Sequence, residues 1–438
     1  MESGVYEDFL DKAFHLLRDY PLCDRCLGRM FARLGMGFSN KERGDAIKKM
    51  VVMRLHQMIR QGDEKAKITF KMMAPHIGSQ ADELYLSIFG EKPTREQCYI
   101  CSDRLDAEIE SATDKAIRLL DEWGVERFLV GARASFDVIR REEEVKTRYR
   151  LVYSESIKNE VKREVGKRVA RRGFVVDFDD PEATVLVELW GPRVSIQVNP
   201  VFFKAVYWKV GRNISQSYWP TRNGVKYPFS VEQATWELRD AMSAERTVIH
   251  AAGREDADAR MLGTGRPLII EVKKPKNRRV SDREAEELLN KGGGSLVLFK
   301  VLGRASRKHV RLYKEEMAGF KKLYKALVVS SQPVDKDELA SLESFFTGRV
   351  ISQRTPLRVS HRRADLTRVK RVYEVKNVPL TSHLFYSFIL AEGGLYVKEL
   401  ISGDEGRTSP SFAEALGKEM ECVDLDVLGV DFNDIGNG

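Results

Sequence analysis

The chain has 438 residues, of which 42% are hydrophobic and 32% are charged. This balance excludes a wholly disordered or collagen-like protein, and the length predicts roughly two or three domains. Lysine and arginine number 73 against 65 acidic residues, a surplus that indicates an anionic partner only where the basic residues cluster. No run approaches the roughly 18 apolar residues of a membrane span, and the acidic start Met1–Asp8 does not resemble a signal peptide. We therefore expect a soluble, cytoplasmic protein.

Four of the five cysteines form two Cys-x-x-Cys pairs, Cys23 with Cys26 and Cys98 with Cys101. In a reducing compartment such pairs favour metal binding over disulfides, and four thiolates satisfy a tetrahedral zinc ion without leaving a position for water. The sequence therefore predicts a structural zinc, with reduced or redox-active thiols as the alternative. Cys422 lies among acidic residues, and we interpret it as a packing residue.

The first half of the chain alternates between two kinds of hydrophobic spacing. Apolar residues at helical intervals predict helices, whereas shorter alternating runs predict strands. Helices are expected at 5–20, 41–62 and 106–123, and strands at 67–73, at 84–89 and from Arg127 onward.

A basic amphipathic helix follows from residue 157. Its apolar positions Ile157, Val161, Val165 and Val169 recur every four residues, and lysines and arginines fill most of the remaining positions up to 172. Short strands are expected at 174–178, 184–189 and 194–198. A basic helix beside a small sheet suits an RNA backbone, although a solvated outer face would show the same pattern.

The composition changes at Pro200, where aromatic residues and Pro/Gly turns become frequent. We therefore expect two domains, 1–199 and 200–438. In the second domain, strands are expected at 266–273, 295–301, 324–329, 369–375 and 394–400, and helices at 230–242, 281–291, 334–346 and 411–420. Strands with interspersed helices, without strict alternation, predict a mixed sheet of the α+β class.

The segment 252–267 concentrates carboxylates and arginines between glycines, immediately before an apolar strand. Neighbouring cations would keep a carboxylate ionised and available as nucleophile or base. Two alternatives remain at this point: a salt-bridged turn, and a magnesium site formed by Glu255, Asp256 and Asp258. Arg254 and Arg260 argue against the magnesium site because they already neutralise the carboxylates.

Three other segments carry candidate binding residues. Tyr324 begins an apolar strand, and Lys398 and Leu400 would leave the same face of the expected strand 394–400. A carboxylate, an aromatic ring and a lysine in one pocket would accommodate a planar base with its ribose. The segment 353–371 holds seven basic residues against one acid, which predicts a loop that binds RNA phosphates or, alternatively, a solvated basic loop.

The stretch from Gly253 to Pro267 resembles the catalytic loop of the tRNA pseudouridine synthase family called Pus-ten, which is found in archaea and eukaryotes. The resemblance extends over most of the chain, including the two cysteine pairs. Other similar stretches are 199–202, 212–220, 353–363 and 395–408. The segment 157–198 resembles the THUMP-type RNA-binding unit of that family's accessory domain.

This resemblance implies a mixed-sheet pseudouridine synthase catalytic domain preceded by a zinc-binding, THUMP-like α/β accessory domain. It implies Asp256 as the nucleophile, with Asp258 as its rival. Arg254 would help to flip the target uridine, Tyr324 would stack on the base, Lys398 would pair with Asp256, and Leu400 would pack beneath the base. The RNA-binding arginines would be Arg354, Arg358, Arg362 and Arg363.

The resemblance also implies the substrate, the T-loop uridines at positions 54 and 55 of tRNA. The isomerisation transfers nothing from outside, so we expect no small-molecule cofactor for the chemistry. Two alternatives are a metal-dependent RNA-processing enzyme and a non-catalytic tRNA-binding protein. The sequence makes no prediction about the oligomeric state.

Overall fold

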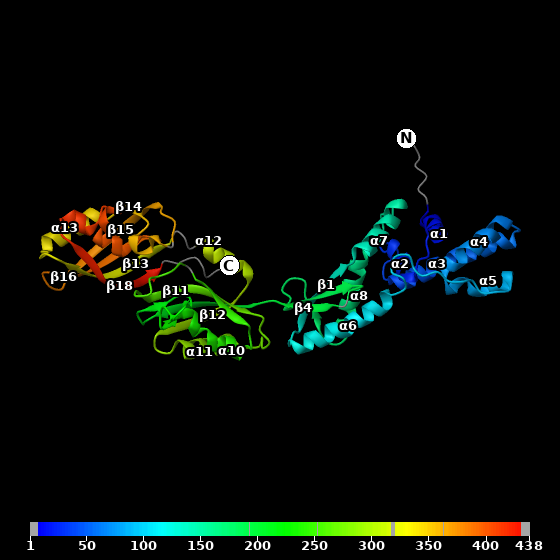
Figure 1. The fold of residues 1–438 in the computed structure, drawn as a ribbon, viewed down its shortest axis with the longest axis horizontal. Coiled ribbons are helices and arrows are strands. Elements are labelled where there is room, and N and C mark those ends of the chain that lie inside the picture. Colours follow the sequence, from blue (N-terminus) through cyan, green and yellow to red (C-terminus); the bar gives the residue numbers. More distant parts are fainter. Residues whose placement is uncertain (1–7, 192, 252, 317–319, 362, 431–438) are drawn as a thin grey trace, which may run out of the picture. The chain divides into compact units, whose positions relative to one another are not determined.

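The computed structural model describes residues 8–191, 193–251, 253–316, 320–361 and 363–430, and it divides into two compact units (Figure 1). Unit 1 is Met1–Asn199 and unit 2 is Pro200–Gly438. Among the described residues, no helix is long and apolar enough to cross a membrane.

Helices dominate the first part of unit 1. Their bounds are α1 (Phe9–Asp19), α2 (Asp24–Met30), α3 (Asn40–Arg60), α4 (Glu64–Ile77), α5 (Asp82–Phe89) and α6 (Leu105–Glu122). The strands expected at 67–73 and 84–89 are wrong, because both segments are helical. Asp63 caps the N-terminus of α4 by accepting hydrogen bonds from the main-chain N–H groups of Lys65 and Ala66. The buried residues of α4 then recur at helical spacing, and this tertiary burial overrides the local alternation of the sequence.

The second part of unit 1 is a small mixed sheet covered by helices. Its strands are β1 (Arg127–Ala134), β2 (Val175–Val176), β3 (Ala183–Leu189) and β4 (Val194–Val198), in the order β2-β1-β3-β4. Strand β1 is parallel to β2 and β3, whereas β3 and β4 are antiparallel. Helices α7 (Phe136–Arg148) and α8 (Ile157–Ala170) complete the unit. The four apolar residues predicted along α8 are fully buried.

Unit 2 is built on a mixed sheet of ten described strands. Their order is β12-β5-β11-β18-β13-β16-β15-β14-β17, with β10 paired to β11. The bounds are β5 (Val201–Lys209), β10 (Arg246–Ala251), β11 (Arg260–Lys273), β12 (Val297–Ala305), β13 (Lys321–Ser330), β14 (Val350–Arg354), β15 (Thr367–Pro379), β16 (Leu384–Glu392), β17 (Thr408–Ser409) and β18 (Met420–Val430). The pairing of β11 with β18 is parallel, and the other described pairs of this sheet are antiparallel.

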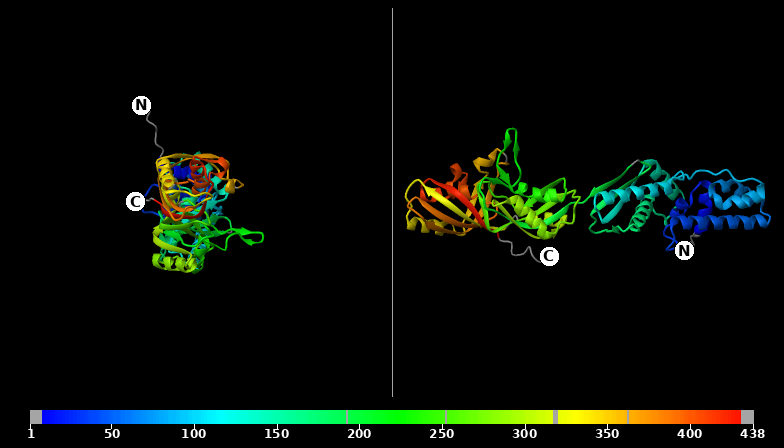
Figure 2. Two further views of the ribbon diagram at one scale, coloured as in Figure 1. Left: turned by 90° about the vertical axis from the view of Figure 1, so that its left-hand side faces the viewer. Right: turned by 90° about the horizontal axis from the view of Figure 1, so that it is seen from below.

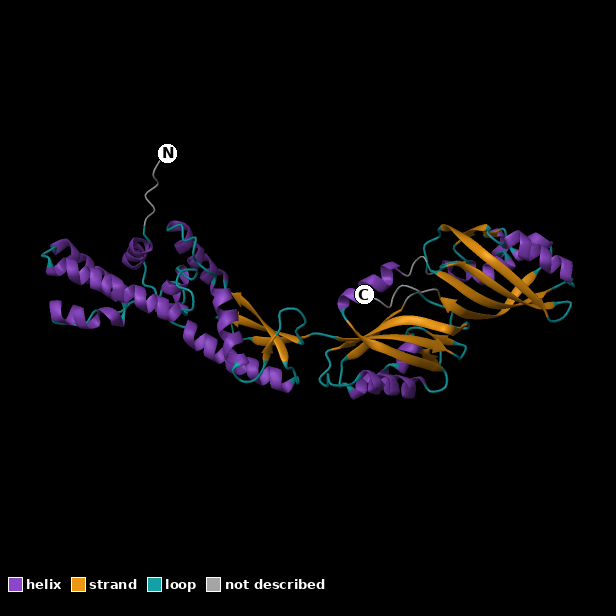
Figure 3. Cartoon of the chain, turned by 180° about the vertical axis from the view of Figure 1, so that it is seen from behind, coloured by secondary structure: helices purple, strands orange, loops and turns teal. Residues whose placement is uncertain are grey.

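Helices cover this sheet (Figures 1 and 3). Two small strand pairs are separate from it. The helices are α9 (Val231–Ala234), α10 (Trp236–Ala241), α11 (Asp282–Gly293), α12 (Arg307–Glu316), α13 (Lys336–Phe346), α14 (Leu357–Ser360), α15 (Val397–Ser402) and α16 (Phe412–Leu416). Strands β6 (Ile214–Ser215) and β9 (Phe229–Ser230) pair with each other, as do β7 (Pro220–Thr221) and β8 (Gly224–Val225). Figure 2 shows the green β7–β8 hairpin standing away from the sheet of this unit.

The strand expected at 394–400 is wrong. Gly394 has φ +94°, a left-handed value that interrupts an extended run, and α15 begins at Val397. Lys398 and Leu400 therefore do not share a strand face. Two residues of separation place them on different sides of a helix.

Candidate active site

A cleft of about 1030 Å³ opens in unit 2. Its walls come from the loop 254–259, the start of β13, the segment from α14 into β15, the start of α15 and strand β18. The lining includes six of the expected site residues together with the rival nucleophile Asp258; the six are Arg254, Asp256, Tyr324, Arg358, Arg363 and Lys398. The fold thus brings together residues separated by more than a hundred positions in the sequence.

A buried lysine holds the loop that carries Asp256. The Nζ atom of Lys209, on β5, donates hydrogen bonds to the carbonyl oxygens of Asp256 (2.8 Å), Ile214 (2.9 Å) and Ala257 (3.2 Å). Lys209 is fully buried. Arg212 donates from Nη1 to the carbonyl oxygen of Asp258 at 2.8 Å, so the main chain is fixed on both sides of residue 257.

Glu255 borders the cleft, but its side chain is buried in a polar cluster. The Tyr207 hydroxyl contacts both of its carboxylate oxygens, at 3.0 and 2.9 Å, and the Arg266 Nε lies 2.8 Å from Oε2. Burial would raise the pKa of the Glu255 carboxyl, but Arg266 and Lys209 hold it below its usual value. These partners already occupy both oxygens, so Glu255 is a poor candidate for a magnesium ligand.

Asp256 reaches the cleft with a side chain that is 33% exposed. Its Oδ2 lies 2.9 Å from an Nη2 of Arg358, and the Nε of Arg358 binds Glu399 at 2.6 Å. Although burial would lower the pKa of Arg358, these two carboxylates raise it above its usual value. Arg358, which the sequence placed among the RNA-binding arginines, is therefore the cation that pairs with Asp256.

Lys398 pairs with a different carboxylate from the one expected. Its Nζ lies 2.5 Å from Oδ2 of Asp258, whose side chain is 54% exposed. Burial would raise the pKa of Asp258, but the hydrogen bond and the charge of Lys398 hold it below its usual value. The family resemblance implied a pairing with Asp256; in the structure Lys398 lies in the first turn of α15 and reaches Asp258 instead.

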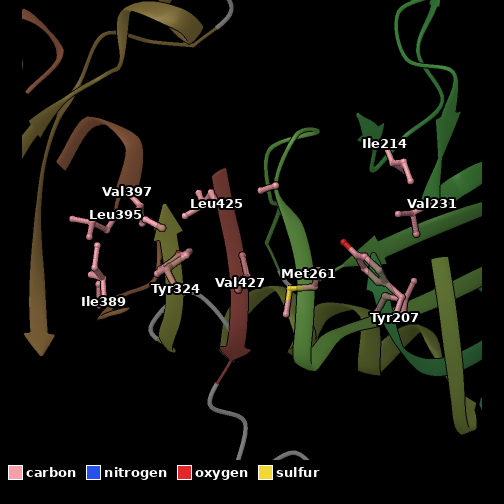
Figure 4. Packing of buried hydrophobic residues seen from close by; sticks show 14 of the residues in the cluster. Tyr207, Ile214, Val231, Met261, Tyr324, Ile389, Leu395, Val397, Leu425 and Val427 are labelled. Atoms are coloured by element: carbon pink, nitrogen blue, oxygen red, sulfur yellow. The ribbon is translucent and has the colours of Figure 1, made fainter. Parts of the chain in front are cut away.

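Tyr324 and several apolar side chains form one wall of the cleft. Tyr324 is 7% exposed and lies near Leu395, Val397 and Leu425 (Figure 4). Burial raises the pKa of its hydroxyl to about 12, so the ring is neutral at physiological pH. Leu400 is fully buried within the hydrophobic core and is not among the residues that line the cleft.

The expected RNA-binding arginines have different surroundings. Arg354 is bound to Asp365 through Nε and Nη2, which ties the start of the basic segment 353–371 to its middle. Arg363 is exposed at the cleft and donates to the hydroxyl of Tyr396 at 2.7 Å. Arg362 lies outside the described residues.

Several residues that line the cleft were not assigned to the site from the sequence. Trp219, Lys226 and Tyr227 come from the segment that forms the β7–β8 hairpin, and Lys322 comes from β13. The Nζ of Lys226 lies 4.5 Å from the centre of the Trp219 ring, and Arg254 covers the same ring at 5.8 Å. The aromatic spacing at 218–227 was visible in the sequence, but nothing there places the hairpin beside Asp256.

The four paired cysteines meet in unit 1, between α2 and α6. Their sulfur atoms all lie within 4.8 Å of one another, and those of Cys23 and Cys101 are 3.5 Å apart. Zn–S bonds of about 2.3 Å in a tetrahedron require sulfur separations of about 3.8 Å, so the cluster fits zinc. The Nη2 of Arg29 donates to the Cys26 sulfur at 3.4 Å. Within the described part of the chain, no other group of Cys, His, Asp and Glu side chains is arranged to hold a metal ion.

Comparison with known proteins decides the family. Residues 202–431 match the family described as "Pus10, C-terminal", and residues 112–188 match "Pus10 THUMP domain, archaeal". The chain belongs to the Pus10 family. This is the Pus-ten family that the sequence motifs indicate, and it confirms a pseudouridine synthase fold with a THUMP domain.

Relatives of this family match over nearly their whole length. A tRNA pseudouridine synthase Pus10 from Aeropyrum pernix is 50% identical over 98% of each chain, and one from Ignisphaera aggregans is 39% identical over 96% of this chain and 98% of its own. A chain in a Cbf5–Nop10–Gar1 complex has a TM-score of only 0.31, at 16% identity over 52% of this chain and 49% of its own. Because the Aeropyrum pernix and Ignisphaera aggregans relatives match nearly the whole chain, the protein is a pseudouridine synthase, an isomerase, rather than a metal-dependent RNA-processing enzyme or a non-catalytic binding protein.

Proposed function

We propose that this protein isomerises the T-loop uridines at positions 54 and 55 of tRNA, with Asp256 as the nucleophile. The observation that carries the proposal is the Asp256 carboxylate, held by Arg358 at 2.9 Å in a cleft that Tyr324 also lines. The curated relatives that match the whole chain are named tRNA pseudouridine synthases, which supports tRNA as the substrate.

Two observations favour Asp256 over Asp258. The carboxylate of Asp256 is paired with an arginine that Glu399 also binds, and the charge of Asp256 acts on the buried Tyr324 hydroxyl. Asp258 is more exposed and is engaged by Lys398. We infer that this second pair positions the loop and closes one side of the cleft.

The chemistry needs only groups that this chain supplies. The Asp256 carboxylate acts on the ribose while the base lies against Tyr324, and the base turns and reattaches through carbon. Arg358 keeps the carboxylate ionised and oriented because its guanidinium binds Asp256 and Glu399 at the same time. Two residues of α15 support the position of Asp256. Lys398 holds the loop through its ion pair with Asp258, and Leu400 anchors the helix in the hydrophobic core.

The target uridine must leave its stack before it can enter the cleft, at a cost of a few kcal/mol. The β7–β8 hairpin offers a replacement for the lost stacking. Its Trp219 and Tyr227 rings are 6.1 Å apart and are accompanied by Lys226 and Arg254. We infer that these residues hold the RNA on either side of the displaced uridine. We also infer that Arg363 contacts a phosphate, and that Arg354 fixes the conformation of the basic segment 353–371 through Asp365.

Unit 1 is proposed to capture the tRNA. Exposed basic residues of α8 accompany its buried apolar face, and the THUMP match ends within this unit's sheet. We propose that a structural zinc ion on Cys23, Cys26, Cys98 and Cys101 holds α2 to the turn before α6. We place the enzyme in the cytoplasm, where tRNA is available.

The test uses an unmodified tRNA transcript incubated with the full chain in EDTA. Pseudouridine at positions 54 and 55 is mapped by chemical probing for the wild type, Asp256→Asn and Asp258→Asn. We expect the wild type to be active and Asp256→Asn to be inactive, because an amide is a very poor nucleophile. Activity that survives in Asp256→Asn and disappears in Asp258→Asn would contradict the choice of nucleophile. Modification confined to other positions would contradict the T-loop assignment.

A further inference from the structure

Lys322 is a basic residue of the cleft that has no role in the reaction proposed for Asp256 and Tyr324. It lies two residues before Tyr324 on β13, so the two side chains leave the same face of the strand, and both line the cleft. Within the part of the chain that the structure describes, its Nζ has no hydrogen bond or ion pair. A lysine side chain so placed keeps its three N–H donors for a ligand.

The ammonium group of Lys322 faces the beginning of the Asp256 loop. A Cβ atom added to Gly253 would lie 3.2 Å from this Nζ and 3.1 Å from an Nη1 of Arg266. The other cations nearby are engaged, because Arg266 pairs with Glu255 at 2.8 Å and Lys370 pairs with Glu392 at 2.6 Å. Lys322 thus differs from Arg266 and Lys370, because no carboxylate among the described residues forms an ion pair with it.

The charges around Lys322 make its protonated form costly in the absence of substrate. Burial lowers the pKa of Lys322 to about 8, and Arg266 of β11 and Lys370 of β15 act in the same direction, while Glu255 opposes them. A ligand that accepts hydrogen bonds or carries negative charge would relieve this cost. The group is therefore suited to interact with a charge that develops during the reaction.

We propose that Lys322 donates a hydrogen bond to a carbonyl oxygen of the target uracil and stabilises the negative charge that forms there when the glycosidic bond breaks. This inference rests on the proposed placement of the uridine between Asp256 and Tyr324. Residues two apart on a strand are separated by about 6.7 Å, a distance that an extended lysine side chain can cover to reach the edge of a base on the Tyr324 ring. Arg363 and Lys226, which are exposed at the mouth of the cleft, remain for the phosphates.

The bond changes show where this charge appears. When the C1′–N1 bond breaks, its electron pair stays with the uracil and spreads over N1 and the two carbonyl oxygens. After the base turns, a new bond forms between C5 and C1′, the C5 proton is released, and N1 gains a proton. The reaction is an isomerisation with no net gain or loss of atoms or electrons. Lys322 acts during the interval in which the base is detached and anionic.

The experiment compares the wild type, Lys322→Met, Lys322→Gln, Lys322→Arg and Lys321→Met as full chains with the same tRNA transcript. Lys321 is the matched control, because it is exposed and its ammonium lies over the Tyr373 ring instead of in the cleft. Loss of one preorganised donor typically lowers the rate about 10²- to 10³-fold, and we expect this loss in the single-turnover rate of Lys322→Met. We expect tRNA affinity to change less than about threefold, since the contact strengthens only in the transition state.

The pH dependence provides a readout that a purely structural role would not change. Because the donating form is the protonated one, kcat/KM of the wild type should fall as the pH rises through about 8. Lys322→Arg, which stays protonated, should recover part of the rate and lose this decline. Lys322→Gln tests the neutral donor and replaces Lys322→Met if thermal melting shows that the methionine variant is unfolded.

Two results would overturn the inference. One is a wild-type single-turnover rate in a folded Lys322→Met or Lys322→Gln. The other is weaker tRNA binding at an unchanged saturated rate, which identifies Lys322 as a phosphate contact. Asp256→Asn, assayed in parallel, separates this failure from failure of the proposed function: an active Asp256→Asn contradicts the placement of the uridine, whereas an inactive one with fully active Lys322 variants contradicts only the role of Lys322.

Discussion

The Nζ atom of Lys209 lies 2.8 Å from the main-chain carbonyl oxygen of Asp256. Lys209 is fully buried on β5, and it joins the strand to the loop without contributing a side chain to the cleft. Burial lowers the pKa of its ammonium, but Glu255 and the three carbonyl oxygens give the charge its partners. Lys209 is thus a positioning residue for Asp256.

Replacing Lys209 should damage stability and activity together. In Lys209→Met, three buried carbonyl oxygens and Glu255 lose a charged donor, and we expect the free energy of unfolding to fall by about 3 to 5 kcal/mol. Urea unfolding and single-turnover assays measure the two effects. Lys336→Met, at an exposed position on α13, is the control and should change neither. A fully stable and fully active Lys209→Met would show that the loop holds its conformation without this lysine.

Arg358 should be more sensitive to conservative replacement than the other basic residues of its segment. A lysine cannot bind Asp256 and Glu399 at once, because it lacks the two-sided geometry of a guanidinium. We expect Arg358→Lys to lower the single-turnover rate about 10- to 100-fold and Arg358→Met to lower it further. Arg371→Met, an exposed change on β15, is the matched control and should affect mainly salt-dependent tRNA binding. Equal losses in Arg358→Met and Arg371→Met would mean that Arg358 is only an RNA contact.

Distinctive local patterns singled out the Asp256 loop and the four cysteines, and the family resemblance singled out Tyr324; the structure brings Asp256 and Tyr324 into one cleft and the four sulfur atoms into one cluster. Strand periodicity wrongly put Lys398 and Leu400 on one face, and the partner that the resemblance implied for Lys398 differs from the observed Asp258. In the structure, Gly394 ends the extended run and α15 changes the direction of both side chains. Local alternation also failed at α4, where burial against the rest of unit 1 decides the helix.

The partner of Asp256 could not be found in the sequence for a different reason. Arg358 is one of seven basic residues in 353–371, and composition alone does not distinguish them. Their roles differ because of tertiary pairs: Arg354 is bound by Asp365, Lys370 by Glu392 and Arg358 by Glu399. Arg358 comes to lie beside Asp256 only when the chain folds.

The Lys398–Asp258 pair should contribute little to stability and act as a unit. Both side chains are partly exposed, so the coupling free energy should be below about 1 kcal/mol. A double-mutant cycle with Lys398→Met and Asp258→Asn measures it in unfolding and in single-turnover rate. We expect each single variant to be slowed less than about tenfold and the double variant to be no slower than the worse single one. Complete inactivation by Lys398→Met with full activity in Asp258→Asn would instead indicate that Lys398 acts on Asp256.

Glu255 should make the protein sensitive to acid. The pKa of Glu255 is lower in the folded chain than in the unfolded chain, where it is about 4.5. The ionised carboxylate therefore stabilises the fold above pH 4.5, and this stabilisation is lost as the pH falls through the pKa of the folded chain. Glu255→Gln should therefore be much less stable than the wild type at pH 7, and this difference should shrink below pH 4.5. Chemical unfolding from pH 3 to 8 measures it. Glu287→Gln, at an exposed position on α11, is the control, and a difference that does not depend on pH in this range would contradict the role given to Glu255.

Removing a cysteine from the four-sulfur cluster should release metal and weaken unit 1 before it affects the chemistry. We expect about one zinc ion per chain in the wild type by elemental analysis, and a large loss of zinc and of thermal stability in Cys98→Ser, because structural zinc contributes directly to folding. Cys422→Ser is the matched control, since Cys422 is also buried but lies outside the cluster, and its zinc content should equal that of the wild type. In Cys98→Ser, the concentration of tRNA needed for half-saturation should rise more than the saturated rate falls. Equal zinc content in Cys98→Ser and Cys422→Ser, or a metal-free wild type of unchanged stability, would contradict the proposed site.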